Sequence, residues 1–300
     1  MSVLIGIISY LPKTDVRTKR LEASRFQIDW LHNLLPHEKM IVVAQGYDES
    51  EYLNEEYISY VKCKQPIGAG NARNEILSQF YHSDYDWLFL WDDDTVLYPY
   101  YNVEEFIYDI LGNEEKFKQI DGVSALEPEY YPYKKLNYED KANLTHYKFE
   151  PRVLNSGSAT SIIRNIKKFY NKEVYYPDID ANKGEGREDI EFLIAWLKEG
   201  LNWYTMQTMI RKSLCFDKSS IFGSDTKKRD ALLMKDLDVI CERYAKDGIT
   251  RDINGRITWS NFNKQFNKSE RILYIIRNKP IEYDEKTTPK EKKTTSKALF

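Results

Sequence analysis

Cysteine pairs, long apolar runs and an excess of charge of one sign are all missing from this sequence. Its 300 residues contain three cysteines, Cys63, Cys215 and Cys241, which are widely spaced and form no Cys-X-X-Cys pair. These features argue against a disulfide framework and against a structural zinc site. We therefore expect a protein of a reducing compartment.

No stretch of about 20 apolar residues occurs, and the first residues have neither a basic segment nor a small-residue cleavage site. We therefore expect a cytoplasmic protein without a membrane anchor. The 44 Lys and Arg residues nearly balance the 47 Asp and Glu residues, and the net charge is −3. Such a balance gives no global field that attracts nucleic acid, so any binding of a polyanion must be local.

What the sequence does contain is an alternation of apolar runs that predicts an α/β fold. With 42% hydrophobic residues, the chain can bury a large core. Buried strands are predicted at residues 3–9, 40–44 and 87–91, and helices at residues 21–35 and 71–80. This order is typical of a mostly parallel sheet with covering helices.

Polar residues stand where the predicted strands end. Ser9 and Tyr10 follow the first strand, Gln45 follows the second, and Asp92 to Asp94 follow the strand at 87–91. Ligands of such sheets bind beyond the carboxyl ends of the strands. Adjacent carboxylates repel one another unless a cation neutralises them, and their oxygens suit Mg²⁺ or Mn²⁺ together with a nucleotide diphosphate. The alternative interpretation is a solvated acidic turn after a core strand.

The segment QPIGAGNARNEIL, residues 65–77, has features of a phosphate-binding turn. Gly68 and Gly70 allow the backbone to approach a ligand, and Arg73 lies near the N-terminus of a predicted helix, where phosphates are favoured. Arg73 is equally suited to holding one of the aspartates in place. An ordinary glycine turn, with Asn71 as the helix N-cap, is the alternative.

A second acidic pair, Glu188 and Asp189, begins the segment EDIEFLIAWLK, which predicts an amphipathic helix. One of these carboxylates is a candidate general base for activating a hydroxyl group. Acidic residues in a first helical turn are also explained by capping and the helix dipole, and that reading stays open.

Four segments in this order resemble GT-A glycosyltransferases, particularly the large family 2 group. They are VVAQGYDES, GAGNARNEIL, FLWDDDT, and LNSGSATSIIRN leading to GREDIEFLIAWLKEG. The resemblance covers residues 3–215 and implies a Rossmann-like GT-A domain with a mostly parallel sheet. It also implies metal-dependent transfer of a sugar from a nucleotide-sugar donor to an acceptor hydroxyl, with Mn²⁺ or Mg²⁺ as the cofactor.

The resemblance also implies roles for individual residues. Asp92 and Asp94 match the family's DxD pair, with Asp94 as a direct metal ligand. The family commonly has an acidic residue in place of Gln45, and many members supply a late histidine to the metal, for which Asp217 is the candidate substitute here. The full set of candidates is Ser9, Tyr10, Gln45, Gly68, Gly70, Arg73, Asp92 and Asp93 for the donor, Asp189 and Glu188 for catalysis, and Asp94, Asp92 and Asp217 for the metal.

The predicted organisation is a catalytic domain at 1–215, a helical extension at 216–283 and a disordered basic tail at 284–300. The tail ends in KALF and resembles the C-terminal peptides by which T-even-type phage replication proteins dock on their sliding clamp. This resemblance predicts hydroxymethylcytosine in phage DNA, or a sugar already attached to it, as the acceptor. Double-stranded DNA and the clamp would then be partners, and the tyrosine-rich stretch 127–150 is a candidate substrate loop.

Three rival functions share parts of this pattern. One is a glycosyltransferase acting on cell-surface polysaccharide or lipid-linked glycan, although the sequence offers no membrane anchor or basic amphipathic helix for it. Another is a nucleotidyltransferase, which would use the same carboxylates and metal but release pyrophosphate. The third is a clamp- or DNA-binding module whose site is degenerate.

Overall fold

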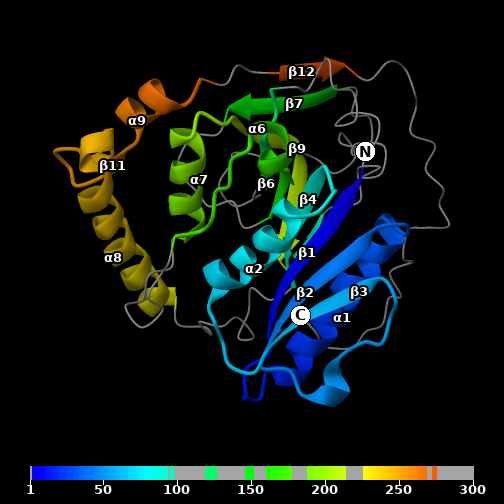
Figure 1. Ribbon diagram of the computed structural model, residues 1–300. Helices are drawn as coiled ribbons and strands as arrows, with labels where there is room; N and C mark the ends of the chain where they lie inside the picture. Colours follow the sequence, from blue (N-terminus) through cyan, green and yellow to red (C-terminus); the bar gives the residue numbers. More distant parts are fainter. Residues whose placement is uncertain are drawn as a thin grey trace.

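The structure is a computed structural model, and it describes residues 2–93, 95–97, 119–126, 146–151, 160–177, 188–213, 226–268 and 272–275. Within these residues a large central sheet is covered by helices on both faces (Figure 1). This arrangement confirms the predicted α/β class.

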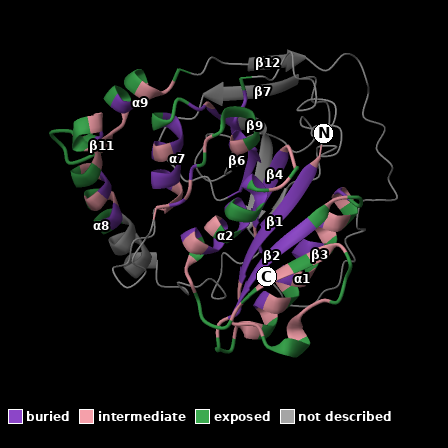
Figure 2. Cartoon of the chain, viewed as in Figure 1, coloured by how far each residue is buried: buried purple, intermediate pink, exposed green. Residues whose placement is uncertain are grey.

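The first half of the sheet is parallel, as predicted. Its strands are β1 (Val3–Tyr10), β2 (Lys39–Gln45), β3 (Ile58–Cys63) and β4 (Trp87–Asp92). They lie in the order β3-β2-β1-β4 and every neighbouring pair is parallel. The continuous apolar runs form these strands because both faces of the sheet are covered, and Figure 2 shows β1, β2 and β4 as buried.

Beyond β4 the sheet is mixed rather than parallel. The strand β8 (Ser161–Arg164) pairs antiparallel with β4 and with β6 (Gly122–Leu126), and β6 pairs parallel with β9 (Trp203–Ser213). The edge is formed by β7 (His146–Pro151) and β12 (Ile272–Ile275), both antiparallel, while the short β5 (Thr95–Leu97) pairs with β9. Sequence patterns missed β7 and β9 because polar side chains interrupt their apolar runs, and they missed β12 because it is short and pairs with a strand far along the chain.

Alternate side chains of each parallel strand pack against helices on opposite faces of the sheet. On one face, Val3, Ile5 and Ile7 of β1 belong to a core that includes α1 (Arg17–Leu34). On the other face, Leu4 and Ile8 belong to a core with α2 (Ala69–Tyr81) and α7 (Glu188–Lys198). The short helix α6 (Ile166–Tyr170) follows β8. The period of two in a strand therefore fixes which helix each residue contacts.

The C-terminal unit packs on α7. It consists of α8 (Thr226–Tyr244), the hairpin of β10 (Thr250–Arg251) and β11 (Ile257–Thr258), and α9 (Ser260–Phe266). Its buried Ile240, Ile249 and Phe262 join the same core as α2 and α7. Within the predicted extension at 216–283, the described residues form α8, α9 and the hairpin, but β12 also lies inside these bounds and pairs with β7 of the main sheet.

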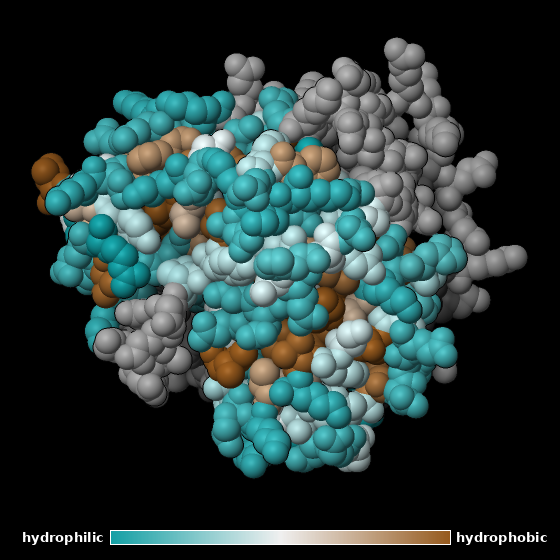
Figure 3. All heavy atoms as spheres, viewed as in Figure 1, coloured by the Kyte–Doolittle hydropathy of each residue, from teal (hydrophilic) through white to brown (hydrophobic). Residues whose placement is uncertain are grey.

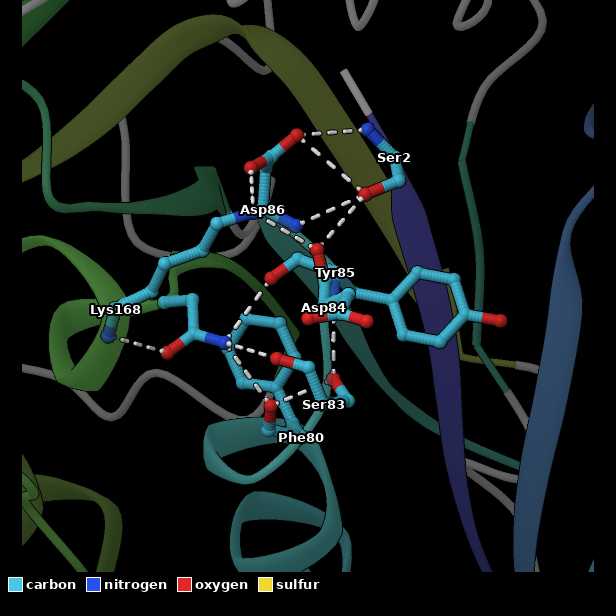
Figure 4. Close-up of polar contacts among 8 residues, drawn as sticks. Ser2, Phe80, Ser83, Asp84, Tyr85, Asp86 and Lys168 are labelled. Carbon is cyan, nitrogen blue, oxygen red and sulfur yellow. Dashed lines mark hydrogen bonds and ion pairs between the residues drawn. The ribbon is translucent and has the colours of Figure 1, made fainter.

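A polar network ties the amino end of the sheet together, at the end opposite the predicted ligand edge (Figure 4). Asp86 accepts hydrogen bonds from the Ser2 backbone N–H at 2.9 Å and from Lys168 Nζ at 2.8 Å. Asn165 donates to the carbonyl oxygens of Phe80 and Tyr85, both at 3.0 Å. The start of β1, the start of β4 and α6 are therefore fixed to one another.

Among the described helices, none combines the length and the apolar character that crossing a membrane requires.

Candidate functional site

The predicted strand ends meet at one edge of the sheet. In the pairing register, Tyr10 lies beside Gln45, and Ile8 lies beside Asp92. The carboxyl ends of β1, β2 and β4 are therefore neighbours, because parallel strands bring residues that are distant in sequence to the same edge. Ser9, Tyr10, Gln45 and Asp92 belong to one site region.

Asp92 and Asp93 face different surroundings although they are adjacent. Asp93 is 4% exposed. Its Oδ1 accepts a hydrogen bond from Arg20 Nη2 of α1 at 2.9 Å, and its Oδ2 accepts one from the Ser9 hydroxyl. Asp93 therefore lies in an inner network that fixes β1 and α1, and its charge is already compensated by Arg20. This differs from the sequence expectation, which grouped Asp93 with the donor-contacting residues.

The inner network also includes Ser9 and two residues that sequence reasoning missed. The Tyr47 hydroxyl lies 2.7 Å from Ser9 Oγ and 2.9 Å from Ser24 Oγ. Burial raises the pKa of Tyr47, and the nearby Asp93 charge raises it further, so this hydroxyl stays neutral. Ser9 is 1% exposed, and the contacts described for its hydroxyl are internal, so its predicted contact with the donor stays a prediction.

Asp92 faces outward and is paired with Arg73. Arg73 Nη2 of α2 lies 2.9 Å from Asp92 Oδ1, and the Asp92 side chain is 23% exposed. The second oxygen, Oδ2, has no hydrogen bond or ion pair within the described part of the chain. Asp92 can therefore offer one carboxylate oxygen to a cation or to a ligand while Arg73 holds the other.

The same guanidinium reaches the second acidic segment. Arg73 Nη1 lies 2.9 Å from Glu188 Oε1 at the start of α7, so Arg73 bridges β4 and α7. Burial by itself would lower the pKa of Arg73, but the negative charges of Asp92 and Glu188 raise it above its ordinary value. The Arg73 guanidinium therefore stays charged, and its side chain is 4% exposed.

Tyr176 completes the surroundings of Arg73. The Arg73 guanidinium carbon lies 5.3 Å from the centre of the Tyr176 ring, which stacks on Phe192 of α7 at 4.2 Å. The Tyr176 backbone N–H donates to Asn74 Oδ1 at 2.7 Å, which fixes the segment before α7 against α2. The sequence did not single out Tyr176, because an isolated tyrosine in a loop predicts no particular partner.

Asp189 differs from Glu188 in its contacts. Asp189 Oδ1 accepts a hydrogen bond from the Ile190 backbone N–H at 2.9 Å, which is a capping interaction at the helix start. Its side chain is partly exposed, whereas Glu188 is occupied by Arg73. The helix-capping interpretation thus holds for one oxygen of Asp189, and it does not exclude a role for its carboxylate in proton transfer.

Gln45 and the two glycines shape the loop before α2. Gln45 Oε1 accepts a hydrogen bond from the Ile67 backbone N–H at 2.8 Å, so it holds this loop against the end of β2. Gly68 has a φ of +84°, which explains why glycine is needed there. Gly70 lies against the α7 start, and a Cβ atom there would contact Glu188 and Tyr176 at 3.5 Å. Gly70 therefore contacts the acidic segment through close packing.

Several predicted residues fall outside the described part of the chain. They are Asp94, Asp217, residues 127–145 of the tyrosine-rich stretch and the tail at 284–300. Among the described residues, no three His, Cys, Asp or Glu side chains form a group that could hold a metal ion. Among the described residues, Asp92 is therefore the candidate metal ligand with an available oxygen at this edge, and Asp94 follows it two residues further along the chain.

Comparison with known proteins bears on the fold. No known family matches the sequence, and no curated protein sequence matches it either. Among solved structures, a mannosyltransferase of Pyrobaculum calidifontis, in complex with GDP-Man and Mn²⁺, is similar with a TM-score of 0.52 at 12% identity, over 80% of this chain and 64% of that chain.

The S. aureus TarS structures are more distant. TarS 1–349 is similar at 15% identity with a TM-score of 0.42, over 70% of this chain and 60% of that chain. Its complex with UDP-GlcNAc is similar at 14% identity with a TM-score of 0.47, over 80% of this chain and 67% of that chain. This chain thus spans about 60% of the first of these proteins. Together with the parallel strands, their helical layers and the carboxylates at the strand ends, the similarity to the mannosyltransferase shows that this chain has the GT-A type of α/β fold.

Proposed function

We propose that this protein is a metal-dependent glycosyltransferase that transfers a sugar from a nucleotide-sugar donor to an acceptor hydroxyl. The observation that supports it best is the Arg73 bridge, which brings Asp92 at the end of β4 next to the acidic start of α7. Glycosyl transfer needs a donor-binding site and a proton-accepting carboxylate close together. The reason is that the acceptor hydroxyl loses its proton as it attacks the sugar carbon from which the diphosphate departs.

In this proposal the carboxylates have separate roles. Asp92 and Asp94 hold Mn²⁺ or Mg²⁺, with Asp217 as a further oxygen ligand. The bound ion would neutralise the charge that develops on the departing nucleoside diphosphate. Asp189 accepts the proton of the acceptor hydroxyl, while Glu188 and Arg73 fix the segment that carries it. Gln45, Gly68 and Gly70 shape the wall of the donor site.

The acceptor is the less constrained part of the proposal. We propose hydroxymethylcytosine in DNA, or its glucosylated form, as one acceptor, with the KALF tail docking on a sliding clamp and a cytoplasmic location. The tail and the tyrosine-rich stretch that motivate this acceptor lie outside the described residues. A cell-surface polysaccharide or glycan is the alternative acceptor, and a nucleotidyltransferase is the alternative chemistry.

The test is release of nucleoside diphosphate. The full chain is incubated with Mn²⁺ and a panel of nucleotide sugars, alone, with plain DNA or with hydroxymethylcytosine DNA. Release that depends on Mn²⁺, stops with a chelator and is stimulated only by the modified DNA supports both the activity and the acceptor. Release without dependence on DNA supports the transferase and directs the acceptor to a glycan.

Two variants sharpen this experiment. Asp92→Asn removes the available carboxylate charge and is expected to abolish Mn²⁺-dependent release. Asp86→Asn, at the opposite end of β4, removes one carboxylate charge outside the site and is expected to keep it. Release of pyrophosphate in place of nucleoside diphosphate would establish the nucleotidyltransferase, and no release from any donor would contradict both enzymatic readings.

A further inference from the structure

A second concave site lies in the C-terminal unit, away from the strand ends. It is a pocket of about 450 Å³ between α8 and the β10–β11 hairpin. In Figure 1 the helix α7 stands between this unit and the central sheet, so the pocket is separate from the edge that carries Asp92. The lining residues are Met234, Leu237, Arg251, Asn254, Gly255, Arg256, Ile257 and Trp259.

The hairpin turn beside this pocket is held in one conformation by its own hydrogen bonds. Asp252 Oδ1 accepts from the backbone N–H groups of Asn254 at 2.8 Å and Arg256 at 2.9 Å. Gly255 has a φ of +74° and donates to the Asp252 carbonyl oxygen at 2.9 Å. The Arg251 side chain binds Asp238 of α8, with Nε 3.0 Å from Oδ1. The turn therefore presents its side chains from a rigid frame, which lowers the entropic cost of binding a ligand.

The polar groups around the pocket are hydrogen-bond donors without partners. Neither the Arg256 guanidinium, the Asn254 side-chain amide nor the Trp259 indole N–H has a hydrogen bond or ion pair within the described part of the chain. Arg256 and Asn254 are exposed, and Trp259 is half-buried. These donors are therefore available to a ligand that offers hydrogen-bond acceptors.

The aliphatic part of the lining consists of Met234, Leu237 and Ile257. Leu237 and Ile257 are partly buried, and Met234 is 51% exposed. The hairpin tip adds Ile253, which is fully exposed. In the space-filling view, hydrophobic surface appears at the left edge, where Figure 1 places β11 (Figure 3). An aromatic and aliphatic floor with a few convergent polar groups, at this volume, is typical of a site for a small polar ring.

We propose that this pocket binds a sugar ring that carries an anionic group, as a unit of the glycan that is the alternative acceptor above. The apolar face of the ring packs on Trp259 and Leu237, its hydroxyls bind the Asn254 amide, and its carboxylate or phosphate binds the Arg256 guanidinium. A nucleic acid backbone is disfavoured because it needs several free cations, whereas the other lining arginine, Arg251, is already paired with Asp238. That the bound sugar is part of the acceptor rests on the proposed function. That the pocket binds an anionic sugar rests on its lining residues alone.

The test measures binding without donor or metal, so that its failure is distinct from failure of the transferase activity. Ligand-detected NMR and calorimetry are performed on the full chain with glucuronic acid, glucose 6-phosphate, glucose and oligo(dT). We expect both anionic sugars to bind more tightly than glucose. Tighter binding of glucuronic acid would identify a carboxylate as the preferred anionic group, and tighter binding of glucose 6-phosphate would identify a phosphate.

Matched variants locate the binding. Arg256→Gln is expected to weaken the anionic sugars about tenfold and to leave glucose unchanged, since one charge-assisted contact is lost. Lys235→Gln removes the same charge from an exposed position of α8 outside the pocket lining and is expected to change nothing. Equal binding by Arg256→Gln and the unsubstituted protein, no binding of either anionic sugar, or stronger binding of oligo(dT) that requires Arg256, would each overturn the proposal.

Discussion

Arg73 and Glu188 are 115 residues apart in the sequence, yet their side chains are joined at 2.9 Å at the edge of the sheet. The guanidinium also holds Asp92, so one buried cation connects the carboxyl end of β4 with the helix start that carries Asp189. A lysine has one compact charge and cannot reach both carboxylates with the planar geometry of a guanidinium. The guanidinium therefore joins the acidic helix start to β4 in addition to the apolar packing of α7 on α2.

Arg73→Lys separates two roles for this residue. Because Arg73 is buried between two carboxylates, we expect it to position Asp189 rather than to bind the donor diphosphate. The variant should then lower kcat about 100-fold, as expected for a displaced reacting group, and leave the donor KM nearly unchanged. Steady-state transfer kinetics measure both. A large rise in donor KM with an unchanged kcat would instead assign Arg73 to diphosphate binding.

Asp189→Asn and Glu188→Gln should have unequal effects. Loss of a general base reduces transfer by about 10²–10⁴-fold, so Asp189→Asn should abolish most transfer while nucleotide binding persists. Glu188→Gln keeps an oxygen that accepts a hydrogen bond from Arg73, and its loss of transfer should be smaller. Transfer rates and calorimetric binding of the nucleoside diphosphate, measured on both variants, test this order. The reverse order would move the base to Glu188.

Asp93→Asn should act on stability. It removes the carboxylate charge that lies 2.9 Å from Arg20 Nη2, and the Arg20 side chain is 5% exposed. Removing one partner of a buried ion pair costs about 3–5 kcal/mol, and urea unfolding measures this as a lower free energy of unfolding. The combined replacement of Arg20→Met with Asp93→Asn should cost less than the sum of the two single changes. Strict additivity would show that the pair does not act as a unit.

Asp86 should make stability depend on pH at the amino end of the sheet. Burial alone would raise its pKa, but the hydrogen bonds from Lys168 and the Ser2 N–H lower it below its ordinary value. A lowered folded-state pKa contributes stability above the unfolded value of about 3.9, and this contribution is lost as the pH falls through the folded value. Asp86→Asn should therefore be less stable at pH 7 by at most about 1 kcal/mol, with the difference vanishing near pH 2.

Urea unfolding of both proteins across this pH range measures the difference. A gap that stays constant with pH would assign the effect to lost hydrogen bonds rather than to charge. Transfer activity should be unchanged in Asp86→Asn, since this residue lies at the opposite end of β4 from Asp92.

Local patterns predicted the parallel half of the fold because its strands are continuous apolar runs. Residues 3–9, 40–44 and 87–91 lie within β1, β2 and β4, and the helices that separate them were found from their spacing. The strands β7 and β9 were missed, since their polar residues match no simple period and their stability comes from pairing with partners far along the chain.

The site could be predicted only in part. Asp92, Arg73, Glu188 and Asp189 were singled out from motif and order, and the DxD resemblance assigned Asp92 but not Asp93 to the metal, but the sequence could not indicate which basic residue each aspartate faces. Their difference follows from the tertiary structure, in which α1 presents Arg20 to one carboxylate and α2 presents Arg73 to the other.

The sequence by itself determined the α/β class, the parallel strands and the edge at which polar residues gather, because apolar periodicity and strand direction are local properties. Only the tertiary structure decided which carboxylate is internal, which faces outward and which acidic residue Arg73 holds. Those pairings join residues from separate elements, and burial makes each unpaired charge costly enough to select its partner.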